Sequence, residues 1–162
     1  MRTKLVSAIA LTLLAGPALA DEGHEYKLQQ MAQHQNEEIA APTKVVMAYA
    51  ITIASKNVDA LSKYVASDGM EFTIFEGSGA NYGWADYRDH HLAPEFANTD
   101  LIFHTYKFND IVTHTSGDMA YSTFAIEMAY TYKGEAKTRT GRGTAILNHD
   151  DDGWKIVHLH TS

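Results

Sequence analysis

The chain has 162 residues and a formal net charge of −7, with 45% hydrophobic residues, nine histidines and no cysteine. A disordered chain would hold fewer apolar residues and a nucleic-acid-binding protein would carry a basic cluster, so this composition excludes both classes and fits one globular domain. No apolar run reaches the roughly 18–20 residues of a membrane-spanning helix. The lack of cysteine excludes disulfides, thiol nucleophiles and thiolate metal sites.

Residues 1–20 have the pattern of an export signal. Two basic residues, Arg2 and Lys4, precede a short apolar stretch that ends in the tripeptide Ala-Leu-Ala, with small residues at both of its ends. We therefore expect a signal peptide that is cleaved after Ala20, leaving a periplasmic or secreted chain of 142 residues (162 minus 20). After cleavage we expect no membrane partner.

The next elements are predicted to be mostly helical. Residues 21–41 are polar and predict an N-terminal arm or a loosely held helix, and the folded domain is expected over residues 42–162. Helical spacing of apolar side chains predicts a core helix over 43–56, a second short helix capped by Asn57 or Asp59, a strand over 70–75, a glycine-rich loop over 76–83 and a third helix over 84–96 that is interrupted at Pro94.

From residue 101 onward the sequence predicts four strands. Short hairpin-type turns separate the segments 101–115, 119–133, 135–149 and 154–161. Long antiparallel strands in sequence make a strongly bent sheet, and such a sheet must bury one face under helices. The predicted fold is therefore α+β, a cone-shaped half-barrel of a curved antiparallel sheet packed against three N-terminal helices. Its open mouth suits small molecules.

The order of these elements and two motifs resemble a known family. Gly117-Asp118-x-Ala-Tyr leads from a turn into a strand, and Trp154-Lys-Ile-Val-His-x-His-x-Ser forms the final strand. Over roughly residues 42–162 the sequence is similar to the SnoaL-like family of the nuclear-transport-factor-2-like superfamily. The resemblance implies a cone-shaped barrel, homodimers formed through the sheet and an internal pocket. It does not imply one function, because isomerases, cyclases, dehydratases and assembly domains share this fold.

The sharpest candidate site is the pair His158 and His160. Alternate strand residues point to one face, and Trp154 and Ile156 share the parity of the pair, so we expect both imidazoles to face the pocket. Three interpretations stay open. The pair could hold a zinc or copper ion with a third ligand such as His91, it could perform acid–base catalysis, or it could form a polar pocket wall. Outside the metal interpretation, no cofactor is expected.

The helices supply the other expected ligand contacts. His91 lies seven residues after Trp84 and is expected to face inward, and Tyr87 lies one helical turn before His91. The predicted ligand-binding set comprises Tyr49, Trp84, Tyr87, His91, His158 and His160. Acid–base candidates are His91, His158, His160 and Glu127.

Charged residues of the sheet and of the predicted loop over 76–83 are further candidates for the pocket. An apolar setting would raise the pKa of Glu127 if its side chain were buried, and Glu76 could also reach the pocket. Arg139 and Arg142 have opposite strand parity, so at most one of them faces inward, where it could pair with a ligand carboxylate. The pattern does not decide which face carries His104.

Taken together, these patterns favour an exported protein that binds a small-molecule ligand in an internal pocket, forms a homodimer and has no nucleic-acid partner. Two alternatives remain. One is an acid–base enzyme of the isomerase, cyclase or dehydratase type, and the other is a periplasmic histidine-rich metal-binding protein.

Overall fold

A computed structural model describes residues 41–162, so the predicted signal peptide and residues 21–40 of the predicted arm lie outside the described residues. A helix runs through residues 41–54, followed by α2 (Val58–Leu61), β1 (Thr73–Glu76), β2 (Gly79–Tyr82), α3 (Trp84–Tyr87), the π-helical segment η1 (Arg88–Leu92), α4 (Ala93–Ala97), β3 (Leu101–Ser116), β4 (Met119–Tyr132), β5 (Glu135–Asp150) and β6 (Gly153–Thr161). None of the helices in this part of the chain is long and apolar enough to cross a membrane.

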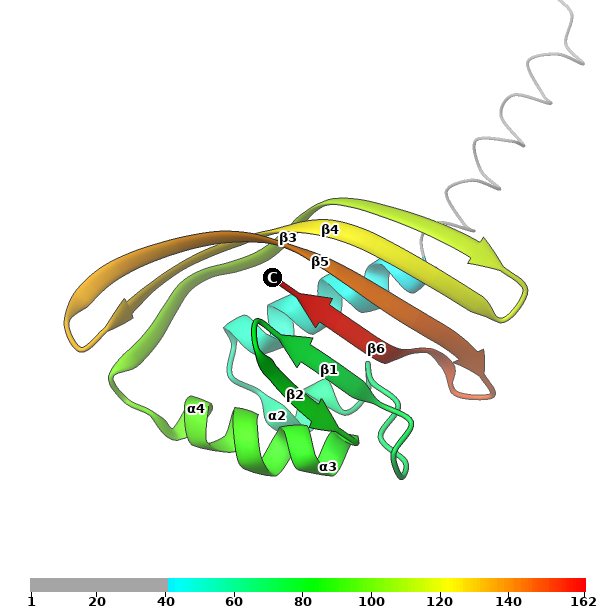
Figure 1. Cartoon of the computed structure of the whole chain (residues 1–162), viewed down its shortest axis with the longest axis horizontal. Coiled ribbons are helices and arrows are strands. Elements are labelled where there is room, and N and C mark those ends of the chain that lie inside the picture. The colour runs from blue at the N-terminus through cyan, green and yellow to red at the C-terminus, as the bar shows by residue number, and fades with distance from the viewer. Residues whose placement is uncertain (1–40) are drawn as a thin grey trace, which may run out of the picture.

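The six strands form one curved sheet in the order β2-β1-β6-β5-β4-β3. All neighbouring pairs are antiparallel except β1 and β6, which are parallel. The three long strands β3, β4 and β5 bend as one layer, and their far end reaches past β6 (Figure 1). The predicted α+β cone is confirmed, with one parallel pair in a sheet that was expected to be wholly antiparallel.

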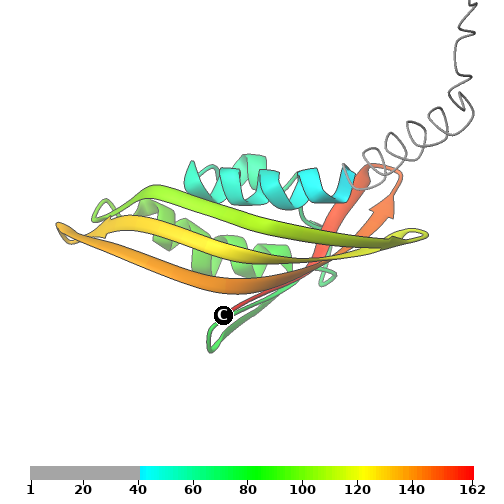
Figure 2. The same ribbon diagram turned by 90° about the horizontal axis from the view of Figure 1, so that it is seen from above.

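The helix at residues 41–54 covers the concave face of the sheet. Val46, Tyr49 and Ile53 recur at helical spacing and are buried, as the sequence predicts for a core helix. The Tyr49 ring stacks on Phe108 with centroids 6.1 Å apart, and Phe108 stacks on Phe124 at 4.0 Å. Figure 2 shows this helix lying along the long strands, which places its C-terminal end beside the space described below.

Two local predictions differ from the structure. Residues 76–83, expected to be a loop, contain β2, which pairs with β1 through a tight hairpin at Gly77, whose φ of 57° suits glycine. The third helix is not interrupted at Pro94. A π-helical turn, η1, precedes the proline, and the helical path continues through α4. Because proline has no amide hydrogen and crowds the preceding turn, a locally widened helix accommodates it.

The strand pairing has three register shifts, two in β3 and one between β5 and β6, and those at His104 and Val157 decide which nearby side chains face the core. His104 is an extra residue between the β3 positions that pair with Tyr130 and Ala129. Val157 is an extra residue in β6, between positions that pair with Leu147 and Ile146. A bulge puts one additional residue into a strand and so reverses the inward and outward alternation beyond it. In β3 and β6, counting alternate residues along the whole strand therefore gives the wrong face for the side chains beyond the bulge.

Lys56 ties the end of the first helix to the segment that leads into β3. Its ammonium group donates to the carbonyl oxygens of Phe96, Asn98 and Leu101, at 3.5, 3.2 and 2.5 Å. Replacing Lys56 by Met keeps the length of the side chain and leaves these carbonyls without their charged donor. We expect Lys56→Met to lower the free energy of unfolding by about 1–3 kcal/mol in urea denaturation. Lys63→Met, at an exposed position, is the control, and an equal loss in both variants would contradict this role.

Candidate functional site

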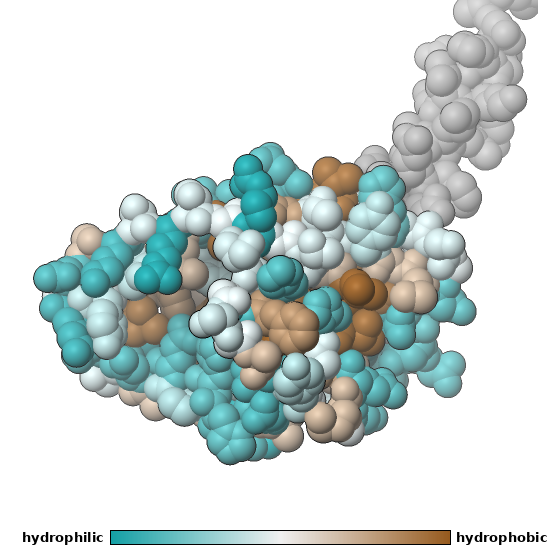
Figure 3. Space-filling model, viewed as in Figure 1, coloured by the Kyte–Doolittle hydropathy of each residue, from teal (hydrophilic) through white to brown (hydrophobic). Residues whose placement is uncertain are grey.

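An inner cavity of about 350 Å³ lies between the helical segment α3–α4 and the far end of the long strands. Figure 3 shows the surface hollowed on the side of the β4–β5 turn, with hydrophobic side chains at the base of the hollow. The lining combines apolar side chains with four ionisable ones. The apolar contributors include Ile53, Leu92, Phe103, Ile126 and Met128, and the ionisable side chains besides tyrosine are Glu76, His91, Glu95 and Arg139.

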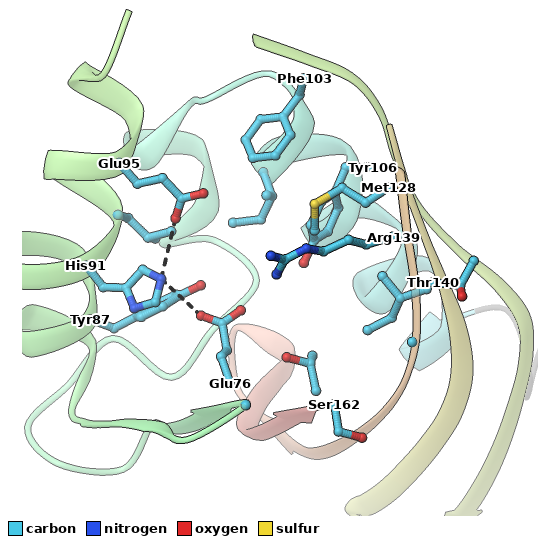
Figure 4. A pocket seen from close by; sticks show the side chains of 16 residues that line it. Glu76, Tyr87, His91, Glu95, Phe103, Tyr106, Met128, Arg139, Thr140 and Ser162 are labelled. Carbon is cyan, nitrogen blue, oxygen red and sulfur yellow. Dashed lines mark ion pairs between the residues drawn. The ribbon is translucent and has the colours of Figure 1, made fainter. Parts of the chain in front are cut away.

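One histidine lies between two carboxylates on the helical wall of the cavity. The Nε2 atom of His91 is 3.2 Å from Oε2 of Glu76 and 3.4 Å from Oε2 of Glu95 (Figure 4). These side chains are only partly exposed, at 35% for His91, 25% for Glu76 and 35% for Glu95. A single imidazole nitrogen thus lies within ion-pair distance of two acids in a half-buried site.

Three elements bring this group together. Glu76 is the last residue of β1, where the strand ends at the cavity rim. His91 lies in the π-helical turn η1, and Glu95 follows it by one turn in α4, so the two share a helix face. The π-helical turn widens the helix beside the end of β1. Single π-helical turns inside α-helices often occur at functional sites for this reason.

The surroundings shift the pKa values of both partners upward. Burial raises the pKa of the Glu76 carboxyl, and this effect outweighs the charge of His91, which acts in the opposite direction. The contact with Glu95 raises the pKa of His91, against the opposing effect of burial, and Glu76 adds to the increase. Glu76 is therefore a stronger base than an exposed glutamate, and His91 holds its proton more tightly than a free imidazole.

Three tyrosines add polar groups in and behind the cavity lining. The hydroxyl groups of Tyr49 and Tyr87 form a buried hydrogen bond at 3.0 Å, and the ring of Tyr87 lies against that of His91, with centroids 5.1 Å apart. Tyr106 lines the cavity from β3, and its hydroxyl has no hydrogen-bond partner among residues 41–162. Burial raises the pKa of Tyr106, so its phenol stays protonated and can donate a hydrogen bond to a molecule in the cavity.

Arg139 lies on the opposite wall. It is placed on the inner face of β5 by its pairing with Met128, and Figure 4 shows its guanidinium extending into the space between the two walls. Arg142 lies three residues further along β5, on the outer face and away from the inner cavity. The structure thus assigns the two arginines to opposite faces.

The cavity contains part of the ligand-binding set predicted from the sequence. Tyr87 and His91 line it, and Tyr49 lies behind Tyr87 and contacts it through the hydroxyl pair. Trp84 is 4% exposed and packs on Phe72 in the core, so it supports the wall and does not form it. The orientation of His91 expected from helical spacing is confirmed.

The prediction that His158 and His160 face the pocket is wrong. Leu159 between them is fully buried, so both imidazoles lie on the outer face of the sheet. His158 Nδ1 is 2.7 Å from Oγ1 of Thr73, and its ring contacts Phe75. The cause is the bulge at Val157. Ile156 faces the core as predicted, but the extra residue turns the two histidines outward.

The three metal-ligand candidates consequently do not meet. His91 lies in the inner cavity, whereas His158 and His160 lie on the outer face of β6. Within the described part of the chain, no group of three or more His, Asp or Glu side chains is arranged to hold a metal ion.

The burial considered for Glu127 is also not found. Its side chain is exposed on the outer face of β4 and accepts a hydrogen bond from Nδ2 of Asn109 at 3.1 Å. The alternation of β4 places Ile126 and Met128 inward, and Glu127 between them faces outward. His104 likewise points outward, with Nε2 2.8 Å from Oγ1 of Thr131.

Sequence reasoning missed Glu95 and Tyr106 as cavity residues and left Glu76 among several carboxylates. The spacing of His91 and Glu95 is a usable signal, because residues four apart meet on a helix face. Tyr106 has no such signal, since its inward orientation depends on the bulge at His104.

Comparisons with known proteins agree with this fold. A family model described as a SnoaL-like domain matches residues 43–162. Among solved structures, a nuclear transport factor 2-like superfamily protein from Salmonella enterica serovar Typhimurium has a TM-score of 0.67 at 20% identity, covering 81% of this chain and 92% of that chain. No curated protein matches the sequence.

Two further structures share the architecture. A proposed ketosteroid isomerase from Shewanella frigidimarina has a TM-score of 0.62 at 26% identity, covering 74% of this chain and 92% of that chain. A proposed dehydratase from Streptomyces avermitilis has a TM-score of 0.67 at 17% identity, covering 79% of this chain and 96% of that chain. At these identities the likeness shows the fold alone.

Removing the charge of Glu95 tests the coupling within the His91 group. We expect Glu95→Gln to lower the pKa of His91, because the neutral amide no longer stabilises the imidazolium. An NMR titration of the His91 ring measures this directly. Glu127→Gln, which changes the charge of an exposed carboxylate on the outer face, should leave the titration unchanged. An unchanged or raised pKa of His91 in Glu95→Gln would contradict the assigned contact.

Proposed function

The chain belongs to the SnoaL-like domain family, and from this premise we propose that its inner cavity binds a small organic carbonyl compound and performs acid–base chemistry on it. The observation that carries the proposal is the Glu76–His91 contact, a half-buried carboxylate with a raised pKa 3.2 Å from a histidine on the cavity wall. Perturbed acid–base pairs in a concave site are typical of catalytic centres. They favour the enzyme alternative over ligand binding without chemistry.

The side chains support a division of roles. The Glu76 carboxylate removes a proton from the carbon next to the substrate carbonyl, and the C–H electron pair forms a carbon–carbon double bond as the carbonyl electrons move to oxygen. The Tyr106 hydroxyl, which has no protein partner among the described residues, donates a hydrogen bond to that oxygen. Protonated Glu76 then returns the proton to another carbon, which completes an isomerisation, or to the same carbon, which gives exchange with solvent. In a dehydration the enolate instead expels a β-hydroxyl group, and protonated Glu76 gives its proton to this group, which leaves as water.

His91 and Glu95 position the proposed base, Glu76, and balance its charge. The imidazolium compensates the charge of Glu76 while substrate is absent, and Glu95 keeps the imidazole protonated. Solved structures of the same fold include a proposed isomerase and a proposed dehydratase, reactions in which a positioned base removes a proton next to a carbonyl. This likeness supports the proposed class of reaction. It does not identify the substrate, which depends on the side chains that line the cavity.

Proton removal can be measured without knowing the substrate. We expect the protein to accelerate exchange of the α-protons of small ketones in D₂O, followed by NMR with phenylacetone, phenylpyruvate and cyclohexanone as probes. Glu76→Gln should lower the catalysed rate by about 10²-fold or more, the usual contribution of a general base. Tyr106→Phe should lower it by a similar factor, because it removes the donor to the developing oxyanion.

Glu127→Gln is the matched control, since it makes the same change outside the cavity and should exchange at the native rate. Absence of catalysed exchange with every probe, or an equal loss in Glu127→Gln, would contradict the proposed chemistry.

We also propose that the protein is exported and acts as a homodimer of chains beginning at Asp21. Exposed apolar side chains on the outer sheet face support a dimer through the sheet, and Val112, Met119 and Tyr121 are 53%, 55% and 48% exposed. Native mass spectrometry of protein recovered from its own compartment should give twice the mass of the 142-residue chain (162 minus 20). A monomer mass, or a chain that retains residues before Asp21, would contradict the corresponding half of the proposal.

A further inference from the structure

We propose that the molecule bound in the inner cavity is a small carboxylic acid, with its carboxylate held by the Arg139 guanidinium and the backbone amide of Thr140. This inference rests on the proposed function for the reacting end of the molecule, which lies at Glu76. The carboxylate end depends on different residues, on the opposite wall, and can be tested separately.

The first observation is that Arg139 has no partner among the described residues. Its guanidinium extends into the cavity (Figure 4), yet it forms no ion pair or hydrogen bond with any residue of the described chain. Glu76 and Glu95, the two acids on the facing wall, pair with His91 instead. A guanidinium presents its donors in a planar fork that matches a carboxylate in two parallel hydrogen bonds. Arg139 is exposed to solvent at the cavity, so its unpaired guanidinium is accessible to such a group.

The second observation is the uncovered edge of β5. Arg142 exchanges both backbone hydrogen bonds with Ser162, donating at 2.8 Å and accepting at 2.9 Å. In an antiparallel strand, alternate residues direct their amides to the same side, so Thr140 directs its N–H to the side of Ser162 as well. No strand of the described chain pairs with Thr140 on that side, and Thr140 lines the cavity. Its amide is a donor next to the Arg139 side chain.

The pairing of charges around the cavity leaves Arg139 without an acidic partner among the described residues. On the helical wall His91 lies between the two acids Glu76 and Glu95, and neither acid pairs with Arg139. Arg139 is then the cationic side chain of the lining that no acid neutralises. A ligand carboxylate at this wall would lie directly against the guanidinium, whereas a second cation would be repelled.

The remaining side chains of the lining indicate the size and polarity of the rest of the ligand. Phe103, Ile126 and Met128 provide an apolar surface between the two polar walls, and the cavity of about 350 Å³ is at the small end of the range for ligand pockets. A compact aryl or alkyl keto acid has a group for each of the three parts of the cavity, which are the Arg139 wall, the apolar surface and the Glu76 wall. Its carboxylate lies at Arg139, and its apolar body contacts Phe103, Ile126 and Met128. The carbon that loses a proton lies at Glu76.

Two probes separate the carboxylate from the rest of the molecule. Phenylpyruvate carries a carboxylate, and phenylacetone has a methyl group in its place with the same ring and ketone. We expect the native protein to bind phenylpyruvate about tenfold or more tightly, measured by NMR or calorimetric titration. Arg139→Gln should remove this preference and leave the affinity for phenylacetone unchanged. The Thr140 amide resonance should shift with phenylpyruvate and not with phenylacetone.

Arg142→Gln is the matched control, because it removes the same charge from the outer face of the same strand and should keep the preference. Arg139→Lys should restore only part of it, since an ammonium lacks the planar fork. An affinity for phenylpyruvate no higher than for phenylacetone, including binding of neither, overturns the inference, as does an equal loss in Arg142→Gln.

The titrations also separate this inference from the proposed function. Glu76→Gln should retain the preference for phenylpyruvate while losing proton exchange. A native protein that prefers phenylpyruvate but exchanges no protons refutes the proposed chemistry and supports carboxylate recognition. Catalysed exchange without the preference refutes carboxylate recognition and supports the proposed chemistry.

Discussion

β5 has 16 residues and β6 has nine, so β6 pairs with only one half of β5. Beyond Gly143 the sheet narrows to three strands, which continue past the end of β6 and bend toward α4 (Figure 1). At this step, Gly141 allows close approach, since a side chain there would lie 2.5 Å from the carbonyl oxygen of Ser162. The space left by the shorter strand is the inner cavity, and it would be filled by backbone if β6 matched β5 in length.

The polar groups around this space are a cost to stability that the core must offset. Half-buried carboxylates and an imidazole lose hydration, and only mutual contact and hydrogen bonding compensate for that loss. The hydroxyl pair of Tyr49 and Tyr87 shows how the site is supported, because it joins the first helix to α3 directly behind His91. Below it, Phe72 packs against Trp84 and Tyr87 of α3 and fixes the position of that helix. The orientation of His91 thus depends on hydrophobic packing on the side away from the cavity.

Sequence patterns predicted the three long strands, the shorter β6 and the core helix because turns and helical spacing are local signals. Of the two caps predicted for α2, Asn57 and Asp59, the structure shows Asn57, whose side chain accepts a hydrogen bond from the Ala60 amide at 3.0 Å. Orientation within strands was less predictable, since the bulges at His104 and Val157 depend on how two strands fit together and not on one strand alone. For the same reason His158 and His160 were placed on the wrong face, while His91, on a helix, was placed correctly.

The two walls of the cavity come from parts of the chain that meet only in the folded state. Glu76, His91 and Glu95 belong to β1 and the helical segment, whereas Arg139 and Tyr106 belong to the long strands. A substitution of Glu76, His91 or Glu95 leaves the backbone around Arg139 in place, so the strength of the base and the recognition of a ligand carboxylate can change independently. This separation gives a physical reason why one curved-sheet architecture can serve different chemistries. The fold provides the space, and a few side chains on each wall determine what enters it and what happens there.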